Sequence, residues 1–211
     1  AAKENINSFE KIKLLPRALI DVGERDLTTS FMGQKFDRPF GIAPMGMCNL
    51  SYPNADILMA KIAKKMNFPH CIATAASTDI EEVYSVGKDN SWFQLYVLHG
   101  AERGIELAKL AHSIGFKTLI LTVDVPQTAR RLRELRNGFN VPFKMGITQF
   151  IDFATHPVWS LRTLATGIPK PILFRNEDNK FERNASRMGA NWSFLDKLRS
   201  FWNGKIFPLS F

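Results

Sequence analysis

Four short apolar segments, separated by amphipathic helical patterns, constrain the fold of this chain more than any other feature. None of the four alternates between apolar and polar residues, which is typical of strands that are buried on both faces. Strands that alternate with helices predict consecutive βα units and a parallel sheet. The four predicted strands are residues 38–44, 71–74, 92–97 and 118–123.

The helices between these strands follow from apolar spacing and from capping residues. Asn54 is a predicted cap for a helix that runs to residue 66, and Asp79 for a helix that begins at residues 79–84. A third helix, 101–114, ends before Gly115. A last helix is predicted over 192–202, and its shared apolar face consists of Trp192, Leu195, Leu198, Phe201 and Trp202. The residues after this helix begin like a fifth strand, which is predicted to stop at Pro208.

Two architectures fit this pattern: an eight-stranded (β/α)8 barrel and a doubly wound open sheet. No Gly-x-Gly-x-x-Gly follows the first strand, which weakens the dinucleotide-binding form of the open sheet. Polar or special residues recur where the strands end, and the carboxyl ends of the strands form the catalytic face of a barrel. These residues are Pro44, Met45, Gly46, Thr74, Gln94, Tyr96, Thr122 and Asp124.

The pattern fades after Asp124. Residues 130–136 are compatible with a short basic helix, and 140–189 contain four prolines and no convincing period. We therefore expect three parts: 1–139 with four βα units, 140–191 as a long functional or mobile loop, and 192–211 as a helix leading to a truncated fifth strand.

Composition excludes several classes of protein. The chain has 211 residues, 45% of them hydrophobic and 23% charged, which argues against a disordered or coiled-coil chain. No apolar run approaches the length of a membrane-spanning helix. No secretory signal is visible at residues 1–5. The missing initiator Met suggests a processed or clipped start. Two cysteines, Cys48 and Cys71, predict buried thiols rather than a disulfide framework or a zinc site.

The net charge of +8 permits an anionic partner without choosing one. The arginines at 130–136 lack the interleaved aromatic residues of a nucleic-acid platform, so we predict no nucleic-acid binding.

Five segments, in order, carry a resemblance to a known family. They are residues 16–22, 42–47, 80–83 with 92–97, 121–126 with Arg130 and Arg131, and 155–159 with 192–204. Together they resemble the FMN-dependent α-hydroxy-acid oxidases and dehydrogenases: glycolate oxidase, flavin-type L-lactate dehydrogenase and mandelate dehydrogenase. The resemblance implies a (β/α)8 TIM barrel of which only about the first half is present.

The resemblance also implies roles for particular residues. The cofactor would be FMN, with the backbone of Pro44, Met45 and Gly46 against its ring, and with Gln94 and Thr122 bonded to its polar edge.

Tyr96 would point its hydroxyl at the substrate, and Arg131 would pair with the substrate carboxylate. The implied reaction oxidises a small (S)-2-hydroxy acid, lactate-like or mandelate-like, to a 2-oxo acid. Full-length members are expected to form homo-oligomers.

Each role has a purely structural alternative. Gln94 and Thr122 can be polar groups satisfied inside a sheet, Tyr96 a core aromatic, and Arg131 part of a solvated basic face. The histidines are in neither metal-ligand nor triad spacing and are read as structural or surface residues: His70, His99, His112 and His156.

Departures from the family pattern shape the functional expectation. No catalytic residue and no metal ligand is assigned, because the family's base, a histidine, would lie beyond the C-terminus, and the family's N-terminal Tyr would lie upstream of Ala1. The segment 204–207, which includes Lys205, stands close to where the family has a flavin-stabilising lysine, but residues 208–211 do not continue the family pattern. Ala73 stands where a serine is usual, and Leu132 replaces an acidic residue.

We therefore expect a fragment, incomplete at both ends and inactive alone. The alternatives are a non-catalytic half-barrel remnant and a membrane-peripheral module that uses 140–189, with Phe150, Phe153, Trp159 and Leu164 among basic residues. The expected location is cytoplasmic, with the inner face of a membrane as a peripheral contact.

Overall fold

The fold is built on a five-stranded parallel sheet. The computed structural model describes residues 2–98, 100–124, 132–137, 146–167 and 189–209. All four strand pairs are parallel, and the strands lie in the order in which they occur along the chain. They are β3 (Ile42–Met45), β4 (His70–Ala73), β5 (Ser91–Tyr96), β6 (Thr118–Thr122) and β7 (Lys205–Leu209).

The strand order decides between the two predicted architectures. A doubly wound sheet reverses its strand order at a switch point, with helices on both faces. Here each strand pairs with the next one in sequence, which is the arrangement of a (β/α)8 barrel. The five strands are therefore part of such a barrel.

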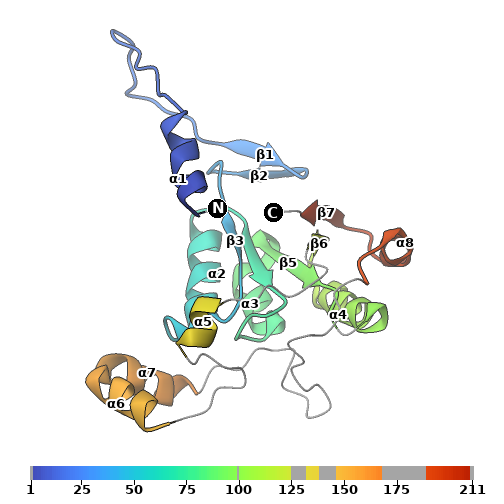
Figure 1. Cartoon of the computed structure of the whole chain (residues 1–211). Helices are drawn as coiled ribbons and strands as arrows, with labels where there is room; N and C mark the ends of the chain where they lie inside the picture. Colours follow the sequence, from blue (N-terminus) through green and yellow to red (C-terminus); the bar gives the residue numbers. More distant parts are fainter. Residues whose placement is uncertain (1, 99, 125–131, 138–145, 168–188, 210–211) are drawn as a thin grey trace.

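One face of the sheet is covered by helices. They are α2 (Ala55–Lys65), α3 (Ile80–Gly87), α4 (Ala101–Ile114) and α8 (Trp192–Arg199), and they follow one another around the outside of the sheet (Figure 1). Alternate strand residues such as Phe93 and Leu119 are buried in one core with Leu107 of α4 and Leu198 of α8. This outer core holds most of the buried apolar side chains that the structure describes.

The other face carries a smaller core that is closed by a hairpin. Cys71, Trp92 and Ile120 come from three adjacent strands and pack with Phe36. Phe36 ends a hairpin of β1 (Thr29–Phe31) and β2 (Gln34–Phe36), and Phe31 stacks on Trp92 with ring centroids 5.9 Å apart. The hairpin therefore caps the amino end of this inner face.

The hairpin was not predicted because its turn carries an unusual pair of residues. Met32 and Gly33 both have positive φ, 54° and 74°. A two-residue turn of this kind normally contains Asn-Gly or Asp-Gly, and Met is a poor indicator of it. Each strand of the hairpin also has only three residues, too few to show a period.

The last helix presents a face different from the predicted one. Trp192, predicted to pack with Leu198 and Trp202, is 80% exposed, whereas Phe194 is buried instead. Asn191 explains the shift, because its side chain accepts a hydrogen bond from the Phe194 amide and starts the helix with Trp192 on the solvent side.

The fifth strand continues past Pro208, where a stop was predicted. The Lys205 amide donates to the Lys117 carbonyl, and the Val123 amide donates to the Leu209 carbonyl. Residues 205 and 209 thus bond to β6, so the alternate position 208 faces the open side of β7. A proline whose missing amide would face outward removes no bond from the ladder.

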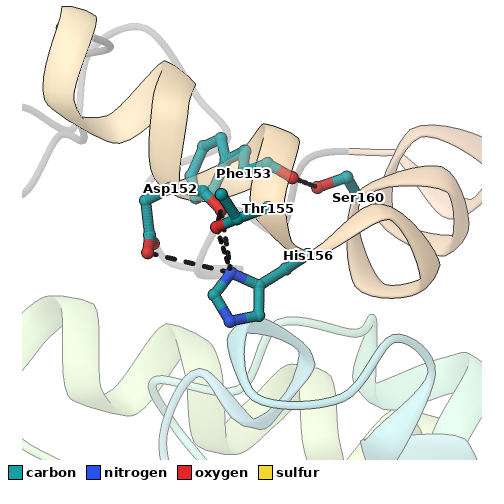
Figure 2. A network of polar contacts seen from close by, with 5 residues as sticks. All are labelled: Asp152, Phe153, Thr155, His156 and Ser160. Atoms are coloured by element: carbon teal, nitrogen blue, oxygen red, sulfur yellow. Dashed lines mark hydrogen bonds and ion pairs between the residues drawn. The ribbon is translucent and has the colours of Figure 1, made fainter.

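In place of the long loop predicted for 140–191, residues 147–166 form two helices. α6 (Ile147–Thr155) and α7 (Pro157–Thr166) meet at His156, whose Nδ1 lies 2.8 Å from the Asp152 carbonyl (Figure 2). The Ser160 hydroxyl donates to the Phe153 carbonyl across the same corner. Pro157 occupies the first helical position of α7, where its missing amide is tolerated.

Four further elements are short or peripheral: α1 (Ala2–Glu10), the 3₁₀ turns η1 (Cys48–Leu50) and η2 (Lys88–Asn90), and α5 (Leu132–Arg136), which lies within the predicted basic helix 130–136. Among the described residues, no helix combines the length and apolar character that crossing a membrane requires.

Candidate active site

Gln94 is the centre of a buried polar network at the carboxyl end of the sheet. It lies on β5, 1% exposed, between a β4 neighbour and a β6 neighbour. Its Nε2 donates to Thr122 Oγ1 at 2.9 Å, and its Oε1 accepts from the Thr74 amide at 3.2 Å. The carboxamide thus joins the ends of three adjacent strands.

Thr74 extends the sheet by one residue with its side chain. Its hydroxyl donates to the Gln94 carbonyl at 2.5 Å and accepts from the Tyr96 amide at 2.9 Å. The Thr74 side chain therefore makes the hydrogen bonds to β5 that the β4 backbone no longer makes after Ala73. Thr74 was predicted as one of the polar residues at the strand ends, and the structure adds this specific task.

The network retains unused hydrogen-bonding capacity for a ligand. Thr122 Oγ1 accepts from Gln94, so within the described residues its own hydrogen stays available for an acceptor beyond the sheet. Gln94 Nε2 likewise carries a second hydrogen. Both side chains point to the inner face, since Gln94 and Thr122 alternate along their strands with residues of the outer core. These donors suit the carbonyl oxygens and ring nitrogens of a planar heterocycle.

The loop after β3 forms the neighbouring wall. Met45 is 47% exposed at the strand end, and Pro44 is half-buried beside it. A Cβ on Gly46 would lie 3.2 Å from the Ala75 Cβ, and the Met47 amide donates to the Ala75 carbonyl. Glycine at 46 therefore allows the loops after β3 and β4 to pack closely. This packing accounts for the glycine without any ligand.

Asp56 holds these two loops together, and sequence reasoning missed it. It is 1% exposed in the first turn of α2, and its Oδ2 accepts from the Ser77 amide at 3.1 Å. The Asn49 side chain accepts from the Asp56 amide and donates to Thr78, which closes the cluster. Burial raises the pKa of Asp56. An acid in a first helical turn normally indicates a solvent-facing charge, so no signal in the sequence marks this role.

The two thiols differ in burial. Both cysteines are free; Cys71 is buried, as predicted, whereas Cys48 is only half-buried. Burial, with the nearby Asp56, raises the pKa of Cys48 to about 11. A thiol of this kind is a weak nucleophile near neutral pH.

Arg131, the predicted partner of the substrate carboxylate, lies outside the described residues, as does His99, which was predicted to be structural or on the surface. Lys205 begins β7 in register with Thr118, at the far end of the sheet, whereas Leu209 is level with Thr122. Lys205 therefore cannot serve the ligand that Thr122 serves.

The histidines described by the structure lie elsewhere. His70 is buried at the start of β4, and burial lowers its pKa to about 4, while His112 and His156 are exposed. Within the described ranges, no group of His, Cys, Asp or Glu side chains could hold a metal ion.

Comparisons with known proteins place this geometry in context. A family model described as FMN-dependent dehydrogenase matches residues 1–207. The (S)-mandelate dehydrogenase of Pseudomonas putida is 31% identical over 97% of this chain and 53% of its own length. An L-lactate dehydrogenase of Vibrio parahaemolyticus is 30% identical over 97% of this chain and 56% of its own length.

The solved structures agree with the sequence comparisons. A crystal structure described as the monotopic membrane protein (S)-mandelate dehydrogenase superposes with a TM-score of 0.87 and 29% identity, covering 99% of this chain and 58% of that one. The chain thus spans little more than half the length of these relatives.

Proposed function

The chain belongs to the FMN-dependent dehydrogenase family, and from that premise we propose that the protein of which it forms part oxidises a small (S)-2-hydroxy acid to a 2-oxo acid with FMN. The named relatives are mandelate and lactate dehydrogenases, which supports a substrate of this class.

The observation that carries the proposal is the Thr74–Gln94–Thr122 network. It presents uncommitted hydrogen-bond donors at the carboxyl ends of adjacent barrel strands, where barrel enzymes bind their ligands. Gln94 and Thr122 would hold the polar edge of FMN, with Pro44, Met45 and Gly46 against the ring. When bound, FMN supplies a two-electron acceptor.

Two further residues would bind the substrate. Tyr96 ends β5, half-buried and level with Thr122, so that its hydroxyl would face a ligand over this network. Arg131 would grip the substrate carboxylate with two parallel hydrogen bonds, a task for which the planar guanidinium is suited.

We also propose that the chain alone is inactive. The side chains of the network are neutral amides and hydroxyls, and none of them can remove a proton at neutral pH. A positioned base contributes about 10²–10⁴-fold to rate.

Flavin binding tests the site directly. Titrating the chain into FMN and following flavin fluorescence should give saturable quenching, and Thr122→Val should weaken the affinity by about tenfold. Thr118→Val is the matched control, since Thr118 lies at the other end of the same strand and is similarly buried. Equal effects of the two variants, or no saturable binding, would contradict the proposed site. Turnover of lactate or mandelate would contradict inactivity.

A second function, peripheral membrane contact, is favoured by α6 and α7. Their outward side carries large apolar side chains that are 58–82% exposed: Ile147, Phe150, Ile151, Val158, Leu161 and Leu164. Such patches on soluble surfaces mark interaction sites. One structural neighbour is described as a monotopic membrane protein, which supports lipid as the partner. We propose the inner face of a membrane as the place of this contact.

Vesicle sedimentation tests this contact. Ile151→Glu should reduce the bound fraction several-fold, because a charge would enter the lipid interface. Ile62→Glu is the control, since Ile62 is 49% exposed and belongs to α2 rather than to α6 or α7. Equal binding by both variants would refute the contact.

A further inference from the structure

A cavity lies where α7 meets the barrel, away from the Gln94 network. Its volume is about 370 Å³, and its lining is almost entirely apolar. It lies between the loop before α2 and the start of α7, and is lined by Tyr52, Pro53, His156, Pro157, Val158, Trp159 and Arg162. Its volume lies within the range of pockets that hold small ligands.

The walls of this cavity are fixed by contacts from α7 to the barrel. Trp159 Nε1 donates to the Leu50 carbonyl at 3.0 Å, and the Phe153 ring packs on the Trp159 ring with centroids 5.1 Å apart. Thr163, one turn further along the same side of α7, is buried. The cavity is therefore a built feature of the fold.

Arg162 supplies positive charge at the cavity. Its guanidinium lies 5.5 Å from the centre of the Tyr52 ring, and Nη1 donates to the Tyr52 hydroxyl at 2.9 Å. Among the described residues, no carboxylate forms an ion pair with it. A guanidinium has five N–H donors, so most of them remain for an anionic ligand.

The cavity is continuous with the exposed apolar side of α6 and α7. Val158 both lines the cavity and is 66% exposed on the outward side. His156 is at the corner between the helices, with its Nδ1 turned toward Asp152 and the rest of the ring turned away from that network (Figure 2). An apolar recess beside an apolar surface, with a guanidinium that no described carboxylate pairs with, matches an amphiphile with an anionic head.

We propose that this cavity binds one anionic phospholipid of the bilayer, with the phosphate on Arg162 and the adjoining chain methylenes over Val158 and Trp159. The proposal rests on the membrane contact proposed above and adds lipid selectivity to it. The net charge of +8 provides general attraction to an anionic surface. The Arg162 site would provide a local contribution beyond that attraction.

Two charge-matched variants test the phosphate contact. The chain, without flavin, is sedimented with vesicles of phosphatidylcholine alone and with vesicles that contain about one-third phosphatidylglycerol. The preference is the ratio of binding to the anionic vesicles over binding to the neutral ones, and Arg162→Gln should lower this ratio about five- to tenfold. Arg103→Gln removes the same formal charge from α4, where Arg103 pairs with Glu106 on the surface, and should leave most of the preference intact. Arg162→Lys should restore much of it, because an ammonium also binds phosphate.

A second pair of variants tests the cavity itself. Val158→Trp fills the recess and should weaken binding to anionic vesicles several-fold. Leu164→Trp adds the same ring on the exposed side of α7, outside the cavity lining, and should not weaken it.

The outcomes separate the two proposals. If the unmodified chain binds neither vesicle, the membrane contact fails and the lipid site with it. If it binds but Arg162→Gln and Arg103→Gln lose the same preference, or Val158→Trp has no effect, the contact stands and the lipid site is overturned.

Discussion

At the scale of single residues, the site depends on buried polar groups that satisfy one another. Gln94 and Thr122 were identified from their position at strand ends and from family resemblance, and the structure adds that each bonds the other. The structural interpretation therefore holds for both side chains, and their ligand-binding role stays a prediction. Burial in a network positions the donors that remain for a ligand.

Replacing the central amide should destabilise the fold. Gln94→Leu leaves the buried Thr74 amide without its acceptor, and we expect the free energy of unfolding in urea to fall by about 1–3 kcal/mol. Gln34→Leu is the control, because Gln34 makes one exposed hydrogen bond, to the Asp89 carbonyl. Equal stability of Gln94→Leu and the unmodified chain would show that the network contributes nothing.

His70 should make stability depend on pH. Burial lowers its pKa from 6.5 to about 4, so between these values the unfolded chain takes up a proton that the folded chain does not. Stability should therefore fall as pH falls through this range, by about 3 kcal/mol in total. Urea titrations of His70→Gln across the range should show a shallower fall; the same slope as in the unmodified chain would count against this assignment.

Some site residues could not be predicted because their role depends on distant neighbours. Asp56 looks like an ordinary first-turn acid, and only the approach of Ser77 from the next loop makes it a buried acceptor. Thr74 was predicted by its place at a strand end, but its bonds to β5 depend on the point where β4 leaves the ladder. Neither partner is visible in local sequence.

At the scale of elements, long and regular patterns were predicted well and short or interrupted ones were not. Helix 101–114 has the predicted bounds and ends at Gly115, which has φ 114°. The helices α6 and α7 were missed because Pro157 divides them into pieces of nine and ten residues. Isolated helices of that length are marginal, so tertiary contacts decide whether they form.

The docking of α7 should depend on Trp159. Trp159→Phe retains a ring but removes the bond to the Leu50 carbonyl, so we expect faster amide exchange across 157–166 by about fivefold, equivalent to about 1 kcal/mol. Trp192→Phe is the control, since Trp192 is 80% exposed on α8. Unchanged exchange in α7 would mean that the bond does not hold the helix.

At the scale of the whole molecule, the described sheet has outer strands β3 and β7, each paired on one side. Open strand edges favour pairing with other chains. Pro208 lies in β7 at a position that faces the open side, where it withholds one donor.

Restoring that donor should promote association. Pro208→Val should raise the fraction of dimer and larger species in sedimentation velocity, whereas Leu209→Val changes a neighbouring side chain without adding an amide. Identical sedimentation of Pro208→Val and the unmodified chain would show that this edge does not limit association.

The sequential strand order also bears on how the molecule reaches its structure. Since each strand pairs with the strand that follows it along the chain, most of the sheet can grow one unit at a time, as the polypeptide leaves the ribosome. The exception is β7, which joins β6 only after the more than eighty residues between Thr122 and Lys205 have been made. Closing so long an interval slows pairing, so β7 and α8 are expected to be the last part of the described sheet to form.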